Sequence, residues 1–435
     1  MAKLNKKKPS LRTHEGGKAK RINSLLQLKR SVMACLLWEK TFYESGEKIG
    51  DRIVELVHEN RPEDVIEIAI TAREKMKLRH VPLLLVRELC RHKDKSRVKV
   101  AEVLARIIQR ADELTEFLAI YWKEGKQSLA NQVKKGLAKA FPKFSAYNLA
   151  KYNRDGEIKL RDVLFLTHPK PKDKEQEDIW KKLVNNTLES PDTWEVSLST
   201  GKDKKETWER LIKEQKLGGL ALLKNLRNME EVGVPKPLVK QALLDMKVDR
   251  ILPFRFITAA RYAPRYEPEL EQAMLKCLES QEKLKDKTIL LVDVSGSMNW
   301  HISDKGETSR IDAACGLGVL LREICEEVSI YTFSNETILV PARRGFALRD
   351  AILSSQDHRG TYLRRALDAI SEHYDRIIVI TDEQTQDNIP NPKGRGYIVN
   401  VGTNQNGIGY GAWLHIDGFS EAIINYLREF EQNEQ

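Results

Sequence analysis

The chain has 435 residues, of which 41% are hydrophobic and 31% are charged, so two or more domains can each bury a core. No apolar run approaches the roughly 18–20 residues that a membrane-spanning helix needs. The five cysteines are scattered and form no CxxC pair, which argues against a zinc site and for reduced thiols. We therefore expect a cytoplasmic protein with no membrane partner.

The formal net charge of +10 is divided unevenly along the chain. Residues 1–285 contain 59 Lys and Arg against 41 Asp and Glu, a net charge of +18. Residues 286–435 contain 14 against 22, a net charge of −8. A basic part joined to an acidic part favours a polyanionic partner for the basic part. A solvated, lysine-rich helical surface would give the same count, so charge leaves both interpretations open.

Residues 1–21 are basic and lack the apolar stretch of a secretory signal, so we expect a flexible cationic arm. Helical spacing of apolar residues then continues from residue 22 to about residue 280. Helices could start at Pro62, Pro82 and Pro191 and could stop at Gly46, Gly125 and Gly233. Many helices without a strand predict an all-α domain over residues 22–284, built of stacked helical hairpins.

The pattern changes after Lys287. Short β-branched runs lie at 288–294, 328–334, 376–382 and 396–402, with helical stretches at 309–327, 361–374 and 419–431. Strands that alternate with helices predict a largely parallel, doubly wound α/β domain over residues 285–435. Ligands bind such sheets beyond the carboxyl ends of the strands. Asp293 and Asp382 each end a predicted strand, so we expect both at one edge of the sheet.

These two acids belong to a candidate metal site. The loop "DVSGS" provides Asp293, Ser295 and Ser297, and the later segments "HRGTYL" and "ITDEQ" provide Thr361 and Asp382. Two carboxylates and three hydroxyls are hard oxygen donors, which suit Mg²⁺ or Mn²⁺ better than zinc. An acidic group from a partner could complete the coordination. An alternative interpretation is that Asp293 and Ser295 only cap the loop and helix that follow.

No enzyme signature accompanies this site. An aspartyl-phosphate phosphatase would have a second Asp two residues after its nucleophile, where this chain has Ser295. The sequence contains no P-loop GK[ST] and no GxSxG elbow, and its nine histidines form no HExxH pair. We therefore expect a protein that is not an enzyme.

The order D-x-S-x-S, then Thr, then Asp resembles the metal-ion-dependent adhesion site of von Willebrand factor A domains. An A-type domain that follows a basic helical half of this size resembles the Ro family of RNA-binding proteins, with its TROVE domain. The resemblance runs from about residue 11 to the C-terminus. The segments that carry it are "LLWEKTFYESG", "LRHVPLLLVREL", "KAFPKFSAYNLAKYNRDG", "RDVLFLTHPKP", "TWEVSLSTGKDKKETWERLI", "PFRFITAARY" and "WLHIDGFSEAI".

This resemblance implies a fold and a function. It implies HEAT-like helical repeats closed into a ring, with a Rossmann-like A domain that ties the two ends together. Family members bind single-stranded ends of misfolded RNAs in a basic central hole and structured Y or Y-like RNAs on the outer surface. We therefore expect a ribonucleoprotein role in small-RNA quality control, with a ribonuclease as a further partner.

The family's RNA contacts cluster near a His-Pro-type turn, which matches "AKYNRDGEIKLRDVLFLTHPKPK" in this chain. The RNA-binding residues that the resemblance implies are Lys151, Arg154, Arg161, His168, Lys170 and Lys172. Lys151 and His168 match best, whereas an altered length between Gly156 and Leu160 makes Arg154 harder to place. Each cation could instead be an ordinary solvated charge, and His168 could serve a turn or the core.

Two functions from different classes are thus open. The first is a non-enzymatic RNA-binding protein of the Ro type with a metal-binding A domain. The second is a metal-dependent protein-adhesion scaffold, whose A domain binds a partner through its metal and whose basic helices have no specific RNA role. RNA binding measured at several salt concentrations would separate the two.

Overall fold

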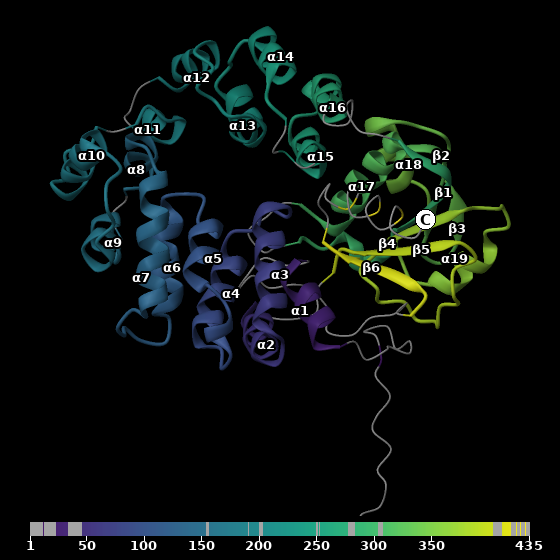
Figure 1. Ribbon diagram of the computed structural model, residues 1–435. Coiled ribbons are helices and arrows are strands. Elements are labelled where there is room, and N and C mark those ends of the chain that lie inside the picture. Colours follow the sequence, from purple (N-terminus) through teal and green to yellow (C-terminus); the bar gives the residue numbers. More distant parts are fainter. Residues whose placement is uncertain are drawn as a thin grey trace, which may run out of the picture. The chain divides into compact units, whose positions relative to one another are not determined.

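The computed structural model describes residues 12, 23–33, 46–153, 156–189, 191–199, 203–248, 251, 253–276, 283–302, 308–402, 411–418, 423, 427 and 431 (Figure 1). These residues form two compact units, a helical unit, Lys48–Asp245, and an α/β unit, Met1–Glu47 with Met246–Gln435. The predicted arm, residues 1–21, lies outside the described residues apart from Arg12. The domain boundaries predicted from the sequence, 22–284 and 285–435, follow secondary-structure pattern rather than packing and stay a prediction.

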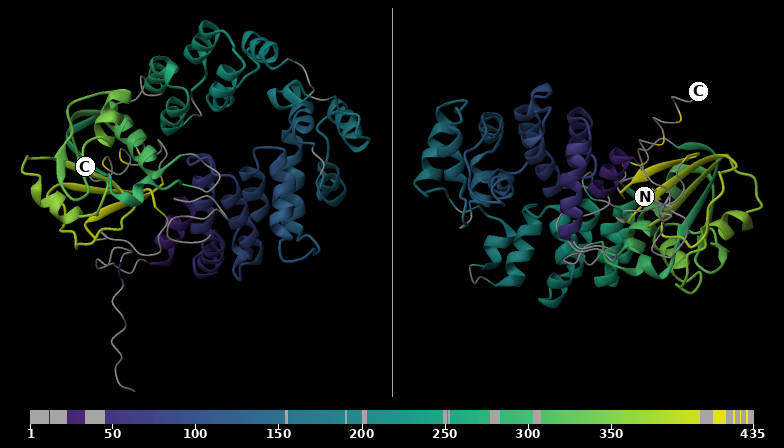
Figure 2. Two further views of the ribbon diagram at one scale, coloured as in Figure 1. Left: turned by 180° about the vertical axis from the view of Figure 1, so that it is seen from behind. Right: turned by 90° about the horizontal axis from the view of Figure 1, so that it is seen from below.

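The helical unit is a succession of α-helices, and its described residues contain no strand. Its helices are α2 (Gly46–Glu59), α3 (Pro62–Glu74), α4 (His80–Arg91), α5 (Val100–Ile107), α6 (Asp112–Tyr121), α7 (Asn131–Ala140), α8 (Ala146–Tyr152), α9 (Leu160–Thr167), α10 (Lys174–Val184), α11 (Trp194–Ser199), α12 (Lys204–Lys213), α13 (Gly219–Glu231) and α14 (Lys236–Asp245). Helices close in sequence pack on one another, as α3 does on α4 and α5 on α7, and Figure 2 shows this stack from two further directions.

The expected helix boundaries are correct at Pro62 and Gly233 and wrong at Gly46. Pro62 is the first residue of α3, and Gly233 follows α13 with a φ of 74°, a left-handed conformation that glycine adopts without strain. The expectation that Gly46 stops a helix is wrong, because Gly46 begins α2. Glycine is tolerated in a first turn, where no intrahelical hydrogen bond to its N–H is required.

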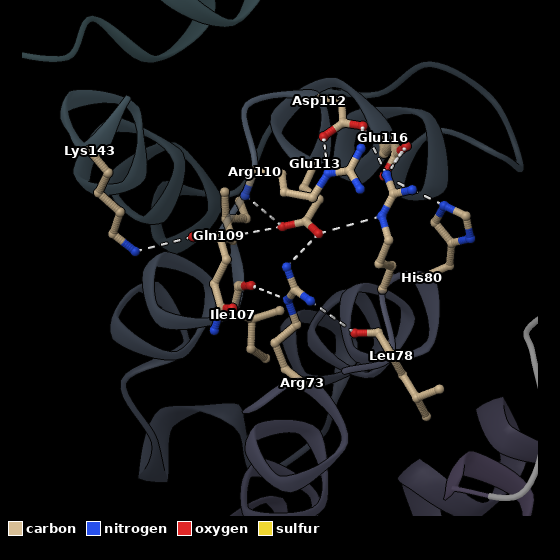
Figure 3. A network of polar contacts seen from close by, with 12 residues as sticks. Arg73, Leu78, His80, Ile107, Gln109, Arg110, Asp112, Glu113, Glu116 and Lys143 are labelled. Atoms are coloured by element: carbon tan, nitrogen blue, oxygen red, sulfur yellow. Dashed lines mark hydrogen bonds and ion pairs between the residues drawn. The ribbon is translucent and has the colours of Figure 1, made fainter. Parts of the chain in front are cut away.

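Buried ion pairs connect the helices of this unit, as Figure 3 shows for α3 and α6. Arg73 donates to Glu113 over 2.6 Å and to the carbonyl of Ile107 over 2.9 Å. The second oxygen of Glu113 accepts the backbone N–H groups of Gln109 and Arg110, just before α6 begins. This one buried carboxylate therefore fixes the start of α6 against the end of α3.

The α/β unit contains a six-stranded sheet in the order β3-β2-β1-β4-β5-β6, with only the β2–β3 pair antiparallel. The strands are β1 (Leu284–Asp293), β2 (Cys325–Phe333), β3 (Thr337–Leu339), β4 (Arg376–Thr381), β5 (Arg395–Asn400) and β6 (Trp413–Asp417). The helices of this unit are α1 (Ser24–Met33), α15 (Pro253–Tyr262), α16 (Glu267–Lys276), α17 (Arg310–Ile324), α18 (Gly345–Leu353) and α19 (Leu363–Ala369). The expected helix-rich region followed by an α/β sheet is confirmed.

Both faces of the sheet are buried. Ile289 and Leu291 of β1 pack with Leu363 of α19 in one hydrophobic cluster. Leu290 and Val292 point to the opposite face, because side chains alternate along a strand, and both are also fully buried. Helix α17 packs against β1 as well. Within the described residues, no helix has the length and apolar character that would let it span a membrane.

Some elements of this unit were not expected from the strand and helix pattern. These are the short edge strand β3 and helix α18. The segment "WLHIDGFSEAI", which the Ro resemblance implies to be a closing strand and helix, begins with strand β6. Of the predicted final helix, 419–431, only residues 423, 427 and 431 are described, so its extent stays a prediction.

Helix α17 carries two glycines with different surroundings. A Cβ added to Gly316 would lie 3.0 Å from the backbone nitrogen of Phe254 and 3.1 Å from its Cα, because α15 crosses there. A Cβ added to Gly318 would meet only the Cδ1 atom of Ile352, at an ordinary 3.4 Å. Gly316 is therefore required for close helix packing, whereas Gly318 is not.

We predict that Gly316→Ala lowers the free energy of unfolding by about 1–3 kcal/mol through overpacking against a backbone that cannot yield easily. Gly318→Ala is the matched control, because both changes gain the same helix propensity of about 1 kcal/mol. This control should be neutral or stabilising. Urea unfolding of both variants provides the measurement, and equal stability of the two would contradict the packing argument.

Candidate functional site

The two acids of the candidate metal site lie at the carboxyl ends of neighbouring parallel strands. Asp293 is the last residue of β1, and Asp382 comes directly after β4. The strands pair in parallel, with Val292 opposite Ile380. Both carboxyl side chains are fully buried. The structure therefore places both acids at one edge of the sheet, as the strand pattern predicts.

The Asp293 carboxylate is held by short hydrogen bonds. One oxygen accepts the backbone N–H of Ser295 over 2.8 Å, and the other accepts the hydroxyl of Thr381 over 2.6 Å. Burial, together with the negative charge of Asp382, raises the pKa of Asp293 to about 7. Two carboxylates close together in the protein interior disfavour full ionisation, and a bound cation would relieve their repulsion.

The three hydroxyl residues belong to loops that contact one another. The Ser295 hydroxyl is 3.4 Å from the Ser297 hydroxyl. The Gly296 N–H donates to the carbonyl of Arg359 over 3.1 Å, which holds this loop against the segment that leads to Thr361. The carbonyl of Thr361 accepts the Thr385 hydroxyl over 2.9 Å. Hydrogen bonds therefore connect the segments that carry the five predicted ligand residues, which are the end of β1 and the loops that follow it, precede α19 and follow β4.

The capping interpretation explains part of this geometry. Asp293 does accept the N–H of Ser295, as an Asp at a turn often does. Ser295 precedes the short 3₁₀ helix Gly296–Asn299, but its side chain accepts no capping hydrogen bond from that helix. Capping alone does not explain why Asp382 is buried beside Asp293.

The donor set fits a hard divalent cation. Asp293 and Asp382 supply charge, and the hydroxyls of Ser295, Ser297 and Thr361 supply neutral oxygen donors, as Mg²⁺ and Mn²⁺ prefer. The described part of the chain holds no group of three or more His, Cys, Asp or Glu residues that could bind a metal. Metal binding at Asp293 and Asp382 would therefore depend on hydroxyl donors.

Two buried arginines at this site were not predicted from the sequence. Arg310, the first residue of α17, lies 2.9 Å from Asp382. Arg30 of α1 lies 2.9 Å from Glu383, whose other oxygen is 2.8 Å from His415 of β6. Burial raises the pKa of Glu383, but the charges of Arg30 and His415 outweigh it and hold the pKa below its ordinary value.

A sequence signal for Arg310 exists in retrospect. It is the single charged residue at the start of an otherwise apolar helix, "RIDAACGLGVLL", apart from Asp312 of the capping box. Arg30 offers no such signal, because an arginine in a helix of both polar and apolar residues is expected on the surface. Only the fold shows that these two cations are buried against neighbouring acids.

The predicted RNA-binding residues lie in the helical unit. Lys151 is in α8, with its ammonium 5.7 Å from the ring centroid of Tyr152. Arg161 is on α9, and His168 follows that helix with a left-handed φ of 47°. Lys170 and Lys172 lie in the segment before α10, and these two lysines, Arg161 and His168 are all exposed. Arg154 lies outside the described residues.

Arg161 differs from the other arginines of the helical unit. The structure gives its side chain no ion pair or hydrogen bond among the described residues. The other described arginines of this unit each form an ion pair or another interaction: Arg52, Arg61, Arg73, Arg79, Arg87, Arg91, Arg97, Arg106, Arg110, Arg210 and Arg227. Arg161 is therefore available to a ligand.

An exposed phenylalanine, which the sequence interpretation missed, accompanies Arg161. Phe165 lies four residues later on α9 and is 58% exposed, whereas Leu160, Val163 and Leu164 of the same helix are buried. Residues four apart share one face of a helix, so the ring and the guanidinium are neighbours on the solvent side. A helical wheel would have shown this aromatic residue on the polar face.

Residues 186–316 match the family described as "TROVE domain". The matched segment makes up less than half of the chain, so the comparison identifies a TROVE-like segment within it. The fold of this chain is similar to that of the Ro (RSR) protein of Deinococcus radiodurans, with a TM-score of 0.61 and 18% identity over 95% of this chain and 100% of that chain. These findings are consistent with a Ro-family protein, as the sequence segments predict.

Two further relatives match a short segment. The telomerase protein component 1 of Rattus norvegicus and that of Mus musculus are each 37% identical to this chain over 89 residues. The match covers 19% of this chain and 3% of each relative, so the chain spans only a small part of their length. It supports the TROVE assignment and carries no information on the rest of those proteins.

We predict that Arg30→Met lowers the free energy of unfolding by about 3–5 kcal/mol, because it leaves the Glu383 carboxylate buried without its guanidinium partner. Combining it with Glu383→Gln should recover most of that loss, since the uncompensated charge is then gone. Arg61→Met, which removes an exposed ion pair with Asp64, is the control and should leave stability unchanged. Additive effects of Arg30→Met and Glu383→Gln in urea unfolding would show that the pair does not couple α1 to the loop.

Proposed function

We propose that this protein binds RNA, and that the exposed face of α9 is one of its contact surfaces. The observation that carries this proposal is the pairing of Phe165, an exposed aromatic ring, with Arg161, a cation that has no acidic partner within the described chain. An aromatic ring accepts a stacked base, and a free guanidinium attracts a phosphate. His168, Lys170 and Lys172 extend the cationic surface beyond the end of α9.

The finer role is proposed from the family. The TROVE match and the fold likeness to a Ro protein support binding of structured Y-like small RNAs and of single-stranded ends of misfolded RNAs. A role in small-RNA quality control, with a ribonuclease as partner, belongs to this proposal, as does a ring of HEAT-like repeats. The role requires no catalysis. The alternative of an adhesion scaffold without an RNA role is not favoured by the TROVE match.

We also propose that the α/β unit is a von Willebrand factor A-type domain that binds Mg²⁺ or Mn²⁺. Asp293 and Asp382 would hold the ion through carboxylate oxygens, and Ser295, Ser297 and Thr361 would add neutral donors. The buried, mutually repelling carboxylates support this proposal. When bound, the ion would supply Lewis acidity for an acidic group of a partner. The cytoplasmic location stays a prediction.

We predict that Phe165→Ala weakens binding of a short unstructured RNA by about 5- to 150-fold, because stacking of one base contributes roughly 1–3 kcal/mol. Phe165→Tyr should bind like the parent, since it keeps a ring at the same position. Leu220→Ala is the control, because Leu220 is another exposed large apolar residue of the helical unit. Fluorescence anisotropy at fixed salt provides the measurement. An equal effect of Phe165→Ala and Leu220→Ala would contradict stacking on α9.

We predict that Asp293→Ala combined with Asp382→Ala abolishes the rise in Tm that millimolar Mg²⁺ or Mn²⁺ produces, because only weak hydroxyl donors are left. RNA binding should survive the double change, since the proposed RNA surface lies in the helical unit. Asp350→Ala, which removes an exposed carboxylate of the same α/β unit, is the control and should keep the metal-dependent shift. The absence of any shift in the parent protein would argue against a metal site.

A further inference from the structure

The buried guanidinium of Arg310 donates a hydrogen bond to one of the carboxylate oxygens that the proposed metal site would use. Its Nη1 atom lies 2.9 Å from Oδ2 of Asp382, and both side chains are buried. We propose that Arg310 is an internal cation that competes with a divalent metal ion for Asp382. This inference rests on the proposed metal site, because it names the group that a metal ion would have to displace there.

The position of Arg310 is fixed by the backbone around it. Its N–H donates to the carbonyl of Trp300 over 2.9 Å, at the end of the loop that contains Ser295 and Ser297. It is the first residue of α17, directly after the N-cap Ser309, whose hydroxyl accepts the N–H of Asp312 while the Asp312 carboxylate accepts the N–H of Ser309. This capping box holds the start of α17 in place. The guanidinium therefore reaches Asp382 from a rigid support rather than from a mobile surface chain.

The charge balance of the site makes the competition necessary. A metal ion binds carboxylates in their ionised form, and in that form Asp293 and Asp382 together with Arg310 carry one net negative charge. A divalent ion added while Arg310 stays would leave one net positive charge in the protein interior, whereas the same ion without Arg310 would give a neutral site. Buried net charge is costly, and two cations on one carboxylate repel each other. Metal binding must therefore either overcome this repulsion or move the guanidinium away from Oδ2.

The test is the affinity of the full-length chain for Mn²⁺, measured by titration calorimetry with the parent and three arginine variants. Arg310→Met should bind Mn²⁺ at least about tenfold more tightly, since a tenfold change corresponds to about 1.4 kcal/mol and charge repulsion at short range exceeds that. Arg310→Lys keeps the charge and should stay close to the parent. Arg376→Met is the matched control, because Arg376 is equally buried but pairs with Glu431 at the other end of β4.

Each outcome decides the proposal. The proposal is supported if Arg310→Met binds Mn²⁺ more tightly than the parent and the other two variants do not. This holds even if the parent binds no Mn²⁺. Equal affinity of the parent and Arg310→Met overturns the competition while leaving the metal site intact. If neither binds Mn²⁺, the metal site itself is wrong and the inference falls with it.

A refolding measurement covers the case in which Arg310→Met does not fold without metal, because Asp382 then lacks its partner. Circular dichroism would follow the folded fraction against Mn²⁺ concentration for Arg310→Met and for Arg310→Met with Asp382→Asn. Recovery of the fold by Mn²⁺ in the first variant and not in the second supports the proposal. No recovery in the first variant overturns it.

Discussion

The α/β unit depends on a short polar loop that it buries completely. Residues 381–385 begin with the last residue of β4 and continue into the loop after it, and all of them are 1% exposed or less. Buried carboxylates and hydroxyls need partners inside the protein, because water cannot reach them. Those partners come from segments that are distant in the sequence, and they are Asp293, Arg310, Thr361, Arg30 and His415. One loop therefore assembles the candidate metal site and also holds α1 in this unit.

Much of the sheet could be predicted from the sequence, because its central strands are continuous β-branched runs with helices between them. The edge of the sheet could not, since the three-residue strand β3 has too few residues for a periodic pattern. The acids of the site could be predicted because they end strands. Their cationic partners could not, because Arg30 and Arg310 lie 353 and 72 residues from the acids that they pair with, and only tertiary packing brings them together.

The same limit applies to the positive charge of the helical half. The net charge of the sequence includes every arginine, yet most arginines of the helical unit form ion pairs with acidic residues of the same unit. Arg73 forms such a pair with Glu113 (Figure 3). Net charge alone therefore overstates the surface that a polyanion could use, which is why it could not separate RNA binding from a solvated helical surface. Arg161 supports RNA binding only because the structure shows that it lies next to the exposed Phe165 and forms no ion pair among the described residues.

The neighbouring acids Asp382 and Glu383 carry the connection between the candidate metal site and α1. Glu383 has a φ of 60°, an unfavourable conformation for a residue with a Cβ, and it is kept there by its partners on α1 and β6. This turn of the backbone lets two adjacent carboxylates reach different elements, Asp382 toward α17 and Glu383 toward α1. Because packed interiors do not deform continuously, any shift of Asp382 toward a metal ion must be absorbed within this buried loop. The contact between Arg30 and Glu383 belongs to this loop, so a metal ion at the candidate site would act on residues that also hold α1.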